Sequence, residues 1–306
     1  MNVSTIEGDP ISGWRKRPVA NLVGIPLNAM TVDVEDYFQV EALSPHISRA
    51  DWDKRECRVE RNVDRILQLF ADNQTKATFF TLGWVAERYP QLVRRIVENG
   101  HELASHGQSH HRADHQSRVQ FFADVTKAKA VLEDIGGVPV NGYRATSFSI
   151  GRRNLWTLSV LDEAGYKYSS STFPINHDLY GIPEQPRHAF YPFADSPFME
   201  IPITTLRRFG RNWPSGGGGY FRLFPYELFK RTLKAARAED RQPCIFYFHP
   251  WEIDPGQPRI AGTSLKTRTR HYLNLNRTFG RLQLLLKDFR WSTVEQVFFA
   301  APSQRQ

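Results

Sequence analysis

Histidine is concentrated in one stretch of the sequence. Residues 101–111 hold four of the chain's ten histidines. His106 and His110 are separated by three residues, so a coiled turn between them would bring both imidazoles to one point, as two ligands of a divalent metal ion must be. The alternative is a polar surface loop that happens to be rich in histidine.

A second concentration is acidic. Asp33, Glu35 and Asp36 come at the end of a predicted first strand, residues 27–34. Three carboxylates at one strand end repel each other unless a cation or an arginine neutralises them. A solvated acidic turn is the alternative, but the aromatic residues 37–38 follow directly and favour a buried turn.

Two more polar residues stand at the ends of predicted strands. Arg144 lies in the predicted strand 142–146, and His249 directly follows the unbroken apolar run 244–248. In α/β folds, functional side chains gather at the carboxyl ends of the parallel strands. We therefore expect these groups to meet the acidic and histidine clusters.

Such a set can carry out hydrolysis. Two imidazoles and one carboxylate form a three-ligand metal site that leaves a position open for water, and bound water becomes acidic enough to act as a nucleophile. A second carboxylate can take the water's proton, and a further histidine can protonate the leaving group. An arginine beside the base would keep that base ionised. This chemistry suits cleavage of an amide or an ester.

The elements that position these residues alternate along the chain. Apolar residues at helical spacing and short β-rich runs follow each other about seven times. This alternation predicts an α/β fold with a parallel sheet, either closed into a (β/α) barrel or open and doubly wound. Amphipathic helices are expected near residues 63–70, 92–97, 117–135, 155–161, 225–233 and 279–286.

Composition bears on the number of domains, the class of partner and the cellular location. With 306 residues and 41% hydrophobic content, the chain can bury a sizeable core, and we expect a single domain at 27–298 after a disordered tail at 1–26. The net charge of +8 is interpreted as spread along the chain, and without a recognised motif it does not indicate nucleic-acid binding. No apolar run reaches the length of a membrane span and no signal peptide is recognised, so we expect no membrane insertion and a cytoplasmic location. The two cysteines fit a reducing compartment.

These motifs resemble those of the polysaccharide deacetylase family (carbohydrate esterase family 4), which carries the NodB homology domain. The family's histidine motif corresponds to His106-Gly-Gln-Ser-His110. Its arginine motif corresponds to Tyr143-Arg144-Ala-Thr146, with threonine at the usual proline position, and its late histidine motif to His249-Pro-Trp-Glu. The resemblance covers most of the chain from about residue 28 onward.

Three features are similar to one branch of that family, which is associated with exosortase and exopolysaccharide gene clusters. They are Thr31-Val-Asp-Val-Glu-Asp-Tyr-Phe, the glycine-rich stretch that ends at Arg222, and the pattern of a DUF3473-type C-terminal region at about residues 165–298. The resemblance implies a distorted (β/α)7-type barrel. It also implies a hydrolase that removes N-acetyl groups, or O-acetyl groups as a second choice, from amino sugars of an acetylated polysaccharide or its precursor in exopolysaccharide biosynthesis.

The resemblance also implies roles for single residues. His106 and His110 would bind a divalent metal, Zn²⁺ first and Co²⁺ or Mn²⁺ as alternatives. Asp33 would be the general base, Arg144 would orient it, and His249 would be the general acid.

The third metal ligand stays open, because the first motif lacks the family's usual adjacent Asp-Asp pair. Glu35 shares a strand face with Asp33, whereas Asp36 is the shorter side chain and lies just past the strand. Asp36 is slightly preferred. Two other functions also stay open: hydrolysis of a cyclic amide, as in the allantoinase-like branch, and a catalytically weak carbohydrate-binding relative, since Ser169 stands where relatives often carry aspartate.

Overall fold

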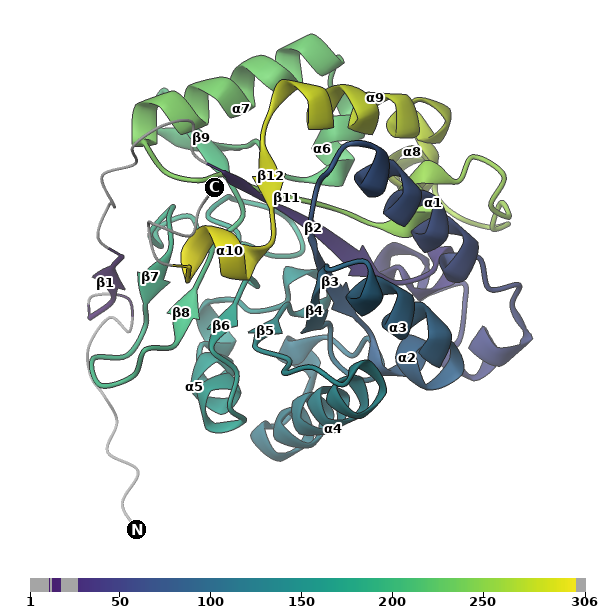
Figure 1. Cartoon of the computed structure of the whole chain (residues 1–306), viewed down its shortest axis with the longest axis horizontal. Helices are drawn as coiled ribbons and strands as arrows, with labels where there is room; N and C mark the ends of the chain where they lie inside the picture. Colours follow the sequence, from purple (N-terminus) through teal and green to yellow (C-terminus); the bar gives the residue numbers. More distant parts are fainter. Residues whose placement is uncertain (1–10, 12, 18–26, 301–306) are drawn as a thin grey trace.

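The computed structural model describes residues 11, 13–17 and 27–300, which form a curved sheet wrapped by helices (Figure 1). Within these residues the sheet runs in the order β1-β7-β8-β6-β5-β4-β3-β2-β11, and β12 also pairs with β2. The strands are β1 Arg15–Lys16, β2 Asn28–Val34, β3 Thr78–Thr81, β4 Glu102–Ser105, β5 Gly142–Tyr143, β6 Tyr168–Ser169, β7 Phe190–Tyr191, β8 Met199–Glu200, β11 Ile245–Phe248 and β12 Trp291–Ser292, with a separate hairpin of β9 Thr205–Arg208 and β10 Arg211–Pro214.

Seven strands of the described sheet, from β11 through β2 to β6 and β8, are parallel neighbours. The helices follow these strands and cover the outside: α1 Val59–Asp72, α2 Gly83–Arg88, α3 Pro90–Glu98, α4 Arg118–Gly136, α5 Trp156–Glu163, α6 Gly218–Leu223, α7 Tyr226–Asp240, α8 Leu265–Tyr272, α9 Leu275–Asp288 and α10 Val294–Phe298. The predicted α/β fold with parallel strands is confirmed.

Irregular backbone, rather than a strand, spans the gap between β8 and β11. Thr204 accepts a hydrogen bond from the Ser215 amide at 3.0 Å, and the next residue, Gly216, accepts one from the Tyr247 amide at 2.9 Å. The barrel is therefore distorted at this place.

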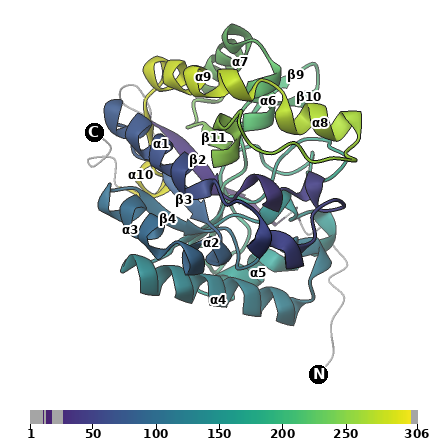
Figure 2. The same ribbon diagram turned by 90° about the vertical axis from the view of Figure 1, so that its right-hand side faces the viewer.

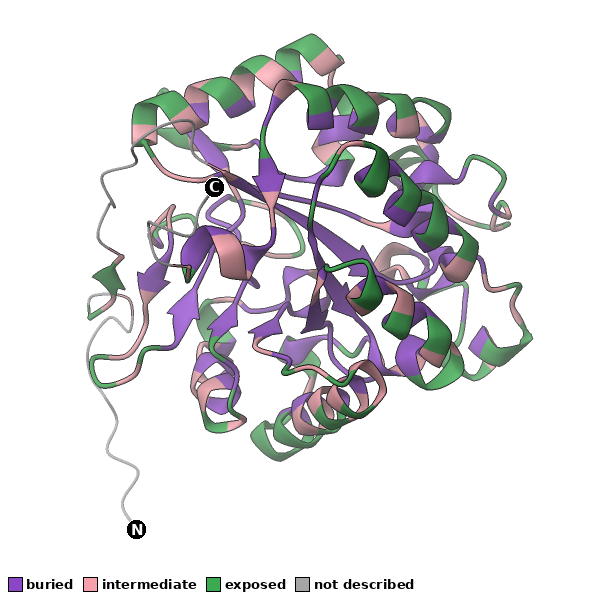
Figure 3. Ribbon diagram, in the orientation of Figure 1, coloured by how far each residue is buried: buried purple, intermediate pink, exposed green. Residues whose placement is uncertain are grey.

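Strand β2 lies in the middle of the sheet and is buried along its whole length. Met30, Val32 and Val34 join the core cluster that packs against α1 and α9. Alternation along the strand points Thr31 and Asp33 to the opposite face, into the barrel. Figure 3 shows the same division, with buried strands inside and helices exposed on their outer sides.

The predicted disordered tail is wrong at residues 13–17. Strand β1 pairs antiparallel with β7, and the Trp14 ring stacks on Phe190 with centroids 4.4 Å apart. A guanidinium nitrogen of Arg17 also donates to the Phe298 carbonyl at 2.7 Å. A two-residue strand is too short to show a periodic pattern in the sequence. The rest of that prediction, residues 1–10, 12 and 18–26, lies outside the described residues.

No helix among the described residues is long and apolar enough to cross a membrane.

Candidate active site

Six polar side chains meet at the carboxyl ends of β2, β4, β5 and β11. A carboxylate oxygen of Glu35 lies 2.6 Å from Nε2 of His110 and 3.9 Å from Nε2 of His106. These three residues are buried, and their potential ligand atoms all lie within 4.8 Å of one another. Asp33, Arg144 and His249 surround this group.

The spacing of His106 and His110 predicts a helical turn, but the structure brings the two rings together through a loop. Residues 106–110 form a loop in which Gly107 (φ +80°) and His110 (φ +55°) take left-handed backbone conformations. The Gly107 carbonyl accepts the Gly83 amide at 2.9 Å, and the His110 carbonyl accepts a guanidinium N–H of Arg49 at 2.6 Å. The backbone of α2 and the Arg49 side chain therefore hold the loop that brings the rings together.

His106 is oriented by the residue after β5. Its Nδ1 lies 2.8 Å from the backbone carbonyl of Arg144, which can only accept, so Nδ1 carries the proton. Nε2 is then left with its lone pair facing Glu35. Burial lowers the pKa of His106 to about 4, which keeps the ring neutral, as a metal ligand must be.

Asp33 and Arg144 form a buried ion pair, with Nη1 of the arginine 2.6 Å from the carboxylate. The guanidinium is completely buried, and its other N–H groups donate to the Thr31 hydroxyl at 2.7 Å and to the Ser170 carbonyl and hydroxyl, both at 2.9 Å. Each of the three guanidinium nitrogens is thus held by at least one hydrogen bond, which fixes the position of the Asp33 carboxylate.

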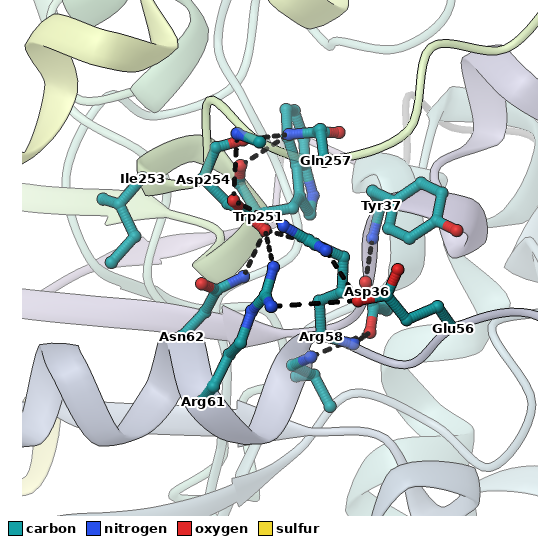
Figure 4. A network of polar contacts seen from close by, with 12 residues as sticks. Asp36, Tyr37, Glu56, Arg58, Arg61, Asn62, Trp251, Ile253, Asp254 and Gln257 are labelled. Atoms are coloured by element: carbon teal, nitrogen blue, oxygen red, sulfur yellow. Dashed lines mark hydrogen bonds and ion pairs between the residues drawn. The ribbon is translucent and has the colours of Figure 1, made fainter.

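The structure separates the two candidates for a third ligand. Glu35 lies with the histidines, whereas Asp36 turns away and accepts the backbone amides of Tyr37, Arg58 and Val59, the last at 2.8 Å (Figure 4). Asp36 thus closes a turn and holds the start of α1. This geometry does not agree with the prediction that prefers Asp36 as the third metal ligand.

Asp36 should therefore matter for stability rather than for metal content. Asp36→Ala would leave buried amides without acceptors, at a cost of about 1–3 kcal/mol in the free energy of unfolding. Denaturant unfolding and metal analysis of the purified variant measure the two effects. An Asp36→Ala protein of unchanged stability that has lost its metal would contradict this assignment.

His249 follows β11 and is held by a chain of buried charges. Its Nδ1 lies 2.7 Å from Glu252 Oε1, and the other carboxylate oxygen of Glu252 accepts Nε of Arg222 at 2.6 Å. Nε2 of His249 points to the reacting groups, 3.8 Å from Asp33 and 3.7 Å from Glu35. Burial lowers the pKa of His249, but Glu35, Glu252 and Asp33 outweigh it and raise the pKa to about 9.

Trp251 connects the acid to the metal-ligand group. Its indole N–H donates to Glu35 at 3.1 Å, and its ring lies between the rings of His249 and His271, at centroid distances of 5.2 and 4.3 Å. Burial raises the pKa of Glu35, but His110, His249 and His106 together outweigh it and hold the pKa well below its usual range. The Glu35 carboxylate is therefore charged.

Arg222 and Glu252 were not predicted as site residues. The glycine-rich stretch before Arg222 leads directly into α6. A Cβ atom on Gly218 would lie 2.4 Å from Glu252 Oε1, so glycine is required for α6 to rest on that carboxylate. The spacing of Glu252, three residues after His249, was the available signal.

Comparisons with known proteins give two family matches along the chain. Residues 52–169 match the family described as "Polysaccharide deacetylase", and residues 170–299 match "Domain of unknown function (DUF3473)". A peptidoglycan deacetylase from Helicobacter pylori is 30% identical over 112 residues, which cover 37% of this chain and 37% of that protein. A chitooligosaccharide deacetylase from Sinorhizobium fredii is 44% identical over 45 residues, 15% of this chain and 21% of that protein. The matched segments thus span well under two thirds of these relatives.

Two solved structures share the fold. One, described as a polysaccharide deacetylase from Mycobacterium smegmatis, has a TM-score of 0.59 at 20% identity and covers 92% of this chain and 93% of its own. The other, an allantoinase, has a TM-score of 0.53 at 16% identity and covers 89% and 90%. The match to the polysaccharide deacetylase family thus covers residues 52–169, and the DUF3473 match follows it directly.

Proposed function

We propose that the protein is a metal-dependent hydrolase that removes N-acetyl groups from amino sugars of a polysaccharide or oligosaccharide. The observation that carries this proposal is the convergence of Glu35, His106 and His110 beside the Asp33–Arg144 pair and His249. These are the groups that hydrolysis of an amide needs, and they occur in a chain whose residues 52–169 match the polysaccharide deacetylase family.

The donor set fits a divalent metal. Two imidazoles and one carboxylate offer three ligand atoms that lie within 4.8 Å of one another, the number that a catalytic metal site uses when it keeps a position for water or substrate. The hydrogen bond from His106 Nδ1 to the Arg144 carbonyl is the kind of outer contact that orients a metal-binding histidine. Nitrogen and carboxylate donors favour Zn²⁺, with Co²⁺ and Mn²⁺ as alternatives. A bound ion would acidify water and polarise the acetyl carbonyl.

The chain's own groups supply the proton transfers. Asp33, paired with Arg144 and held in position by it, accepts a proton from the attacking water. His249, protonated through its contacts with Glu252 and the neighbouring carboxylates, donates a proton to the departing amine nitrogen. Nε2 of His249 lies 3.8 Å from the Asp33 carboxylate, so the acid and the base both border the metal-ligand group.

The proposed substrate class and biosynthetic role rest on similarity to known proteins rather than on the geometry of the site. Relatives named for peptidoglycan and chitooligosaccharide support an N-acetylated glycan as the substrate. The sequence branch supports a role in exopolysaccharide biosynthesis, on an acetylated polysaccharide or its precursor in the cytoplasm.

Acetate release tests the proposal. Purified protein loaded with Zn²⁺, Co²⁺ or Mn²⁺ should release acetate from N-acetylated chito-oligosaccharides and acetylated exopolysaccharide fragments, and removal of the metal by a chelator should abolish the activity. Allantoin serves as the comparison substrate. Turnover of allantoin without acetate release from any glycan would contradict the proposal.

A further inference from the structure

Positive charge is distributed unevenly along the chain, which corrects the initial interpretation of an even spread. Residues 201–306 hold 18 Lys and Arg against 7 Asp and Glu, whereas residues 1–200 hold 22 against 25. The positive net charge therefore comes entirely from the C-terminal third of the sequence, and the structure shows where that third lies.

The basic residues of this region gather on one side of the molecule. Figures 1 and 2 both place α7 and α9 together on the same side. Lys230 of α7 pairs with Asp288 of α9 at 2.7 Å, and Arg208 of the β9–β10 hairpin pairs with Glu239 of α7. Exposed basic residues of these three elements form what we call the basic face: Arg211, which is on the same side of the hairpin as Arg208, and Arg231, Lys234, Arg277 and Lys287.

The acidic residues near this face are mostly neutralised. Glu239 and Asp288 are held in the ion pairs just described, and Asp240 pairs with Arg187 at 2.7 Å. Glu227 is the remaining carboxylate on α7, and it is exposed. The five basic side chains of the face thus leave a clear positive excess.

Large apolar side chains are exposed among these basic residues. Of the ten large hydrophobic residues exposed in the described part of the chain, six lie between residues 209 and 284. Phe209 is 94% exposed at the tip of the β9–β10 hairpin, and Trp213 on β10 is 51% exposed. Leu228 on α7 and Leu284 on α9 are about half exposed. The tip is a two-residue turn in which Phe209 itself has a left-handed backbone (φ +51°), so an aromatic ring stands out into solvent from a rigid turn.

We propose that the basic face binds the surface of an anionic lipid bilayer. Exposed aromatic and leucine side chains set among arginines and lysines are the combination that proteins use at bilayer interfaces: the rings enter the headgroup region and the cations pair with lipid phosphates. A soluble acidic polymer would match the charges but would not cover Phe209 at the hairpin tip. This contact is peripheral and involves no insertion of a helix.

The contact would keep the barrel beside the membrane. Helix α9 packs against residues 250–253, which include Trp251 and Glu252, so one of the bilayer-facing helices supports the acid side of the candidate active site. An acetylated glycan attached to a lipid carrier would then be presented close to the barrel.

Co-sedimentation with vesicles tests this inference without any substrate, so its outcome does not depend on deacetylase activity. The protein is mixed with vesicles of phosphatidylcholine alone or of phosphatidylcholine with phosphatidylglycerol. Both mixtures are measured at about 0.1 M and about 1 M salt, over which the Debye length falls from about 10 Å to about 3 Å. We expect binding only to the anionic vesicles and only at the lower salt concentration.

Two variants and two matched controls locate the surface. Arg231→Gln with Lys234→Gln should weaken binding roughly 30-fold, as expected for two basic residues at an anionic surface. Phe209→Ser should weaken it roughly tenfold. The controls are Arg94→Gln with Arg153→Gln, and Val119→Ser on α4, all exposed positions outside the face; they should bind as the wild type does. Thermal melting confirms that each variant is folded.

Three results would overturn the inference. They are an absence of binding to anionic vesicles at about 0.1 M salt, an equal loss in the control variants, and retention on an immobilised acidic polysaccharide without vesicle binding. The last result would assign the face to a soluble polyanion instead.

Discussion

Asp33→Asn should lower kcat for acetate release by a factor on the order of 10² to 10⁴ while the protein keeps its metal. The substitution preserves the shape of the side chain and its hydrogen bond from Arg144, which lies 2.6 Å from the carboxylate. It removes the group that accepts the proton of water. The three potential metal ligands are other residues, so metal content should not change.

Asp36→Asn is the matched control for this experiment. It makes the same chemical change three residues along, at a carboxylate that accepts backbone amides instead of facing the barrel. We expect kcat within a few-fold of wild type. If Asp33→Asn lost its metal, or if Asp36→Asn lost activity to the same extent, the roles assigned to the two aspartates would be wrong.

Arg222→Met should destabilise the fold by about 3–5 kcal/mol, because it leaves the buried Glu252 carboxylate without its cation. The same guanidinium also donates to the carbonyls of Arg270, His271 and Leu273, each at 2.9 Å, and so fixes the connection between α8 and α9. Denaturant unfolding of Arg222→Met and of Arg231→Met, an exposed arginine on the neighbouring helix, measures the effect. The exposed variant should stay within about 0.5 kcal/mol of wild type.

The Arg222–Glu252 pair also affects the pKa of His249, and a more conservative substitution tests this effect. Glu252→Gln keeps the packing but removes a negative charge that raises the pKa of His249 above its usual value. Activity that requires a protonated His249 is lost as pH rises through that pKa, so the alkaline limb of the kcat profile should move to lower pH. An unmoved alkaline limb would mean that Glu252 does not act on the acid. Equal stability of Arg222→Met and Arg231→Met would mean that the Arg222–Glu252 pair does not support the fold.

Much of the fold could be predicted because burial leaves a simple pattern. The run that forms β11 is continuously apolar, as expected for a parallel strand buried on both faces, and helices such as α1 show one apolar face. Site residues that stand directly at strand ends, such as Arg144 and His249, could be placed for the same reason. The sheet then brings those ends together.

Other features depend on tertiary contacts that no local pattern records. The choice between Glu35 and Asp36 is decided by the backbone amides of Arg58 and Val59, more than twenty residues away. The short strand β1 exists because β7 offers it an edge and Phe190 offers Trp14 a ring to stack on. The glycines before Arg222 look like a flexible turn until Glu252 is known to lie against Gly218.

The measurement that tests the central claim most directly is metal content together with acetate release, determined in parallel for the wild type, Glu35→Gln, Asp36→Asn and His106→Ala. We predict a metal-containing, active wild type, loss of both metal and activity in the Glu35 and His106 variants, and retention of both in Asp36→Asn. A Glu35→Gln protein that keeps its metal and its activity, beside an Asp36→Asn protein that loses them, would contradict the proposed site.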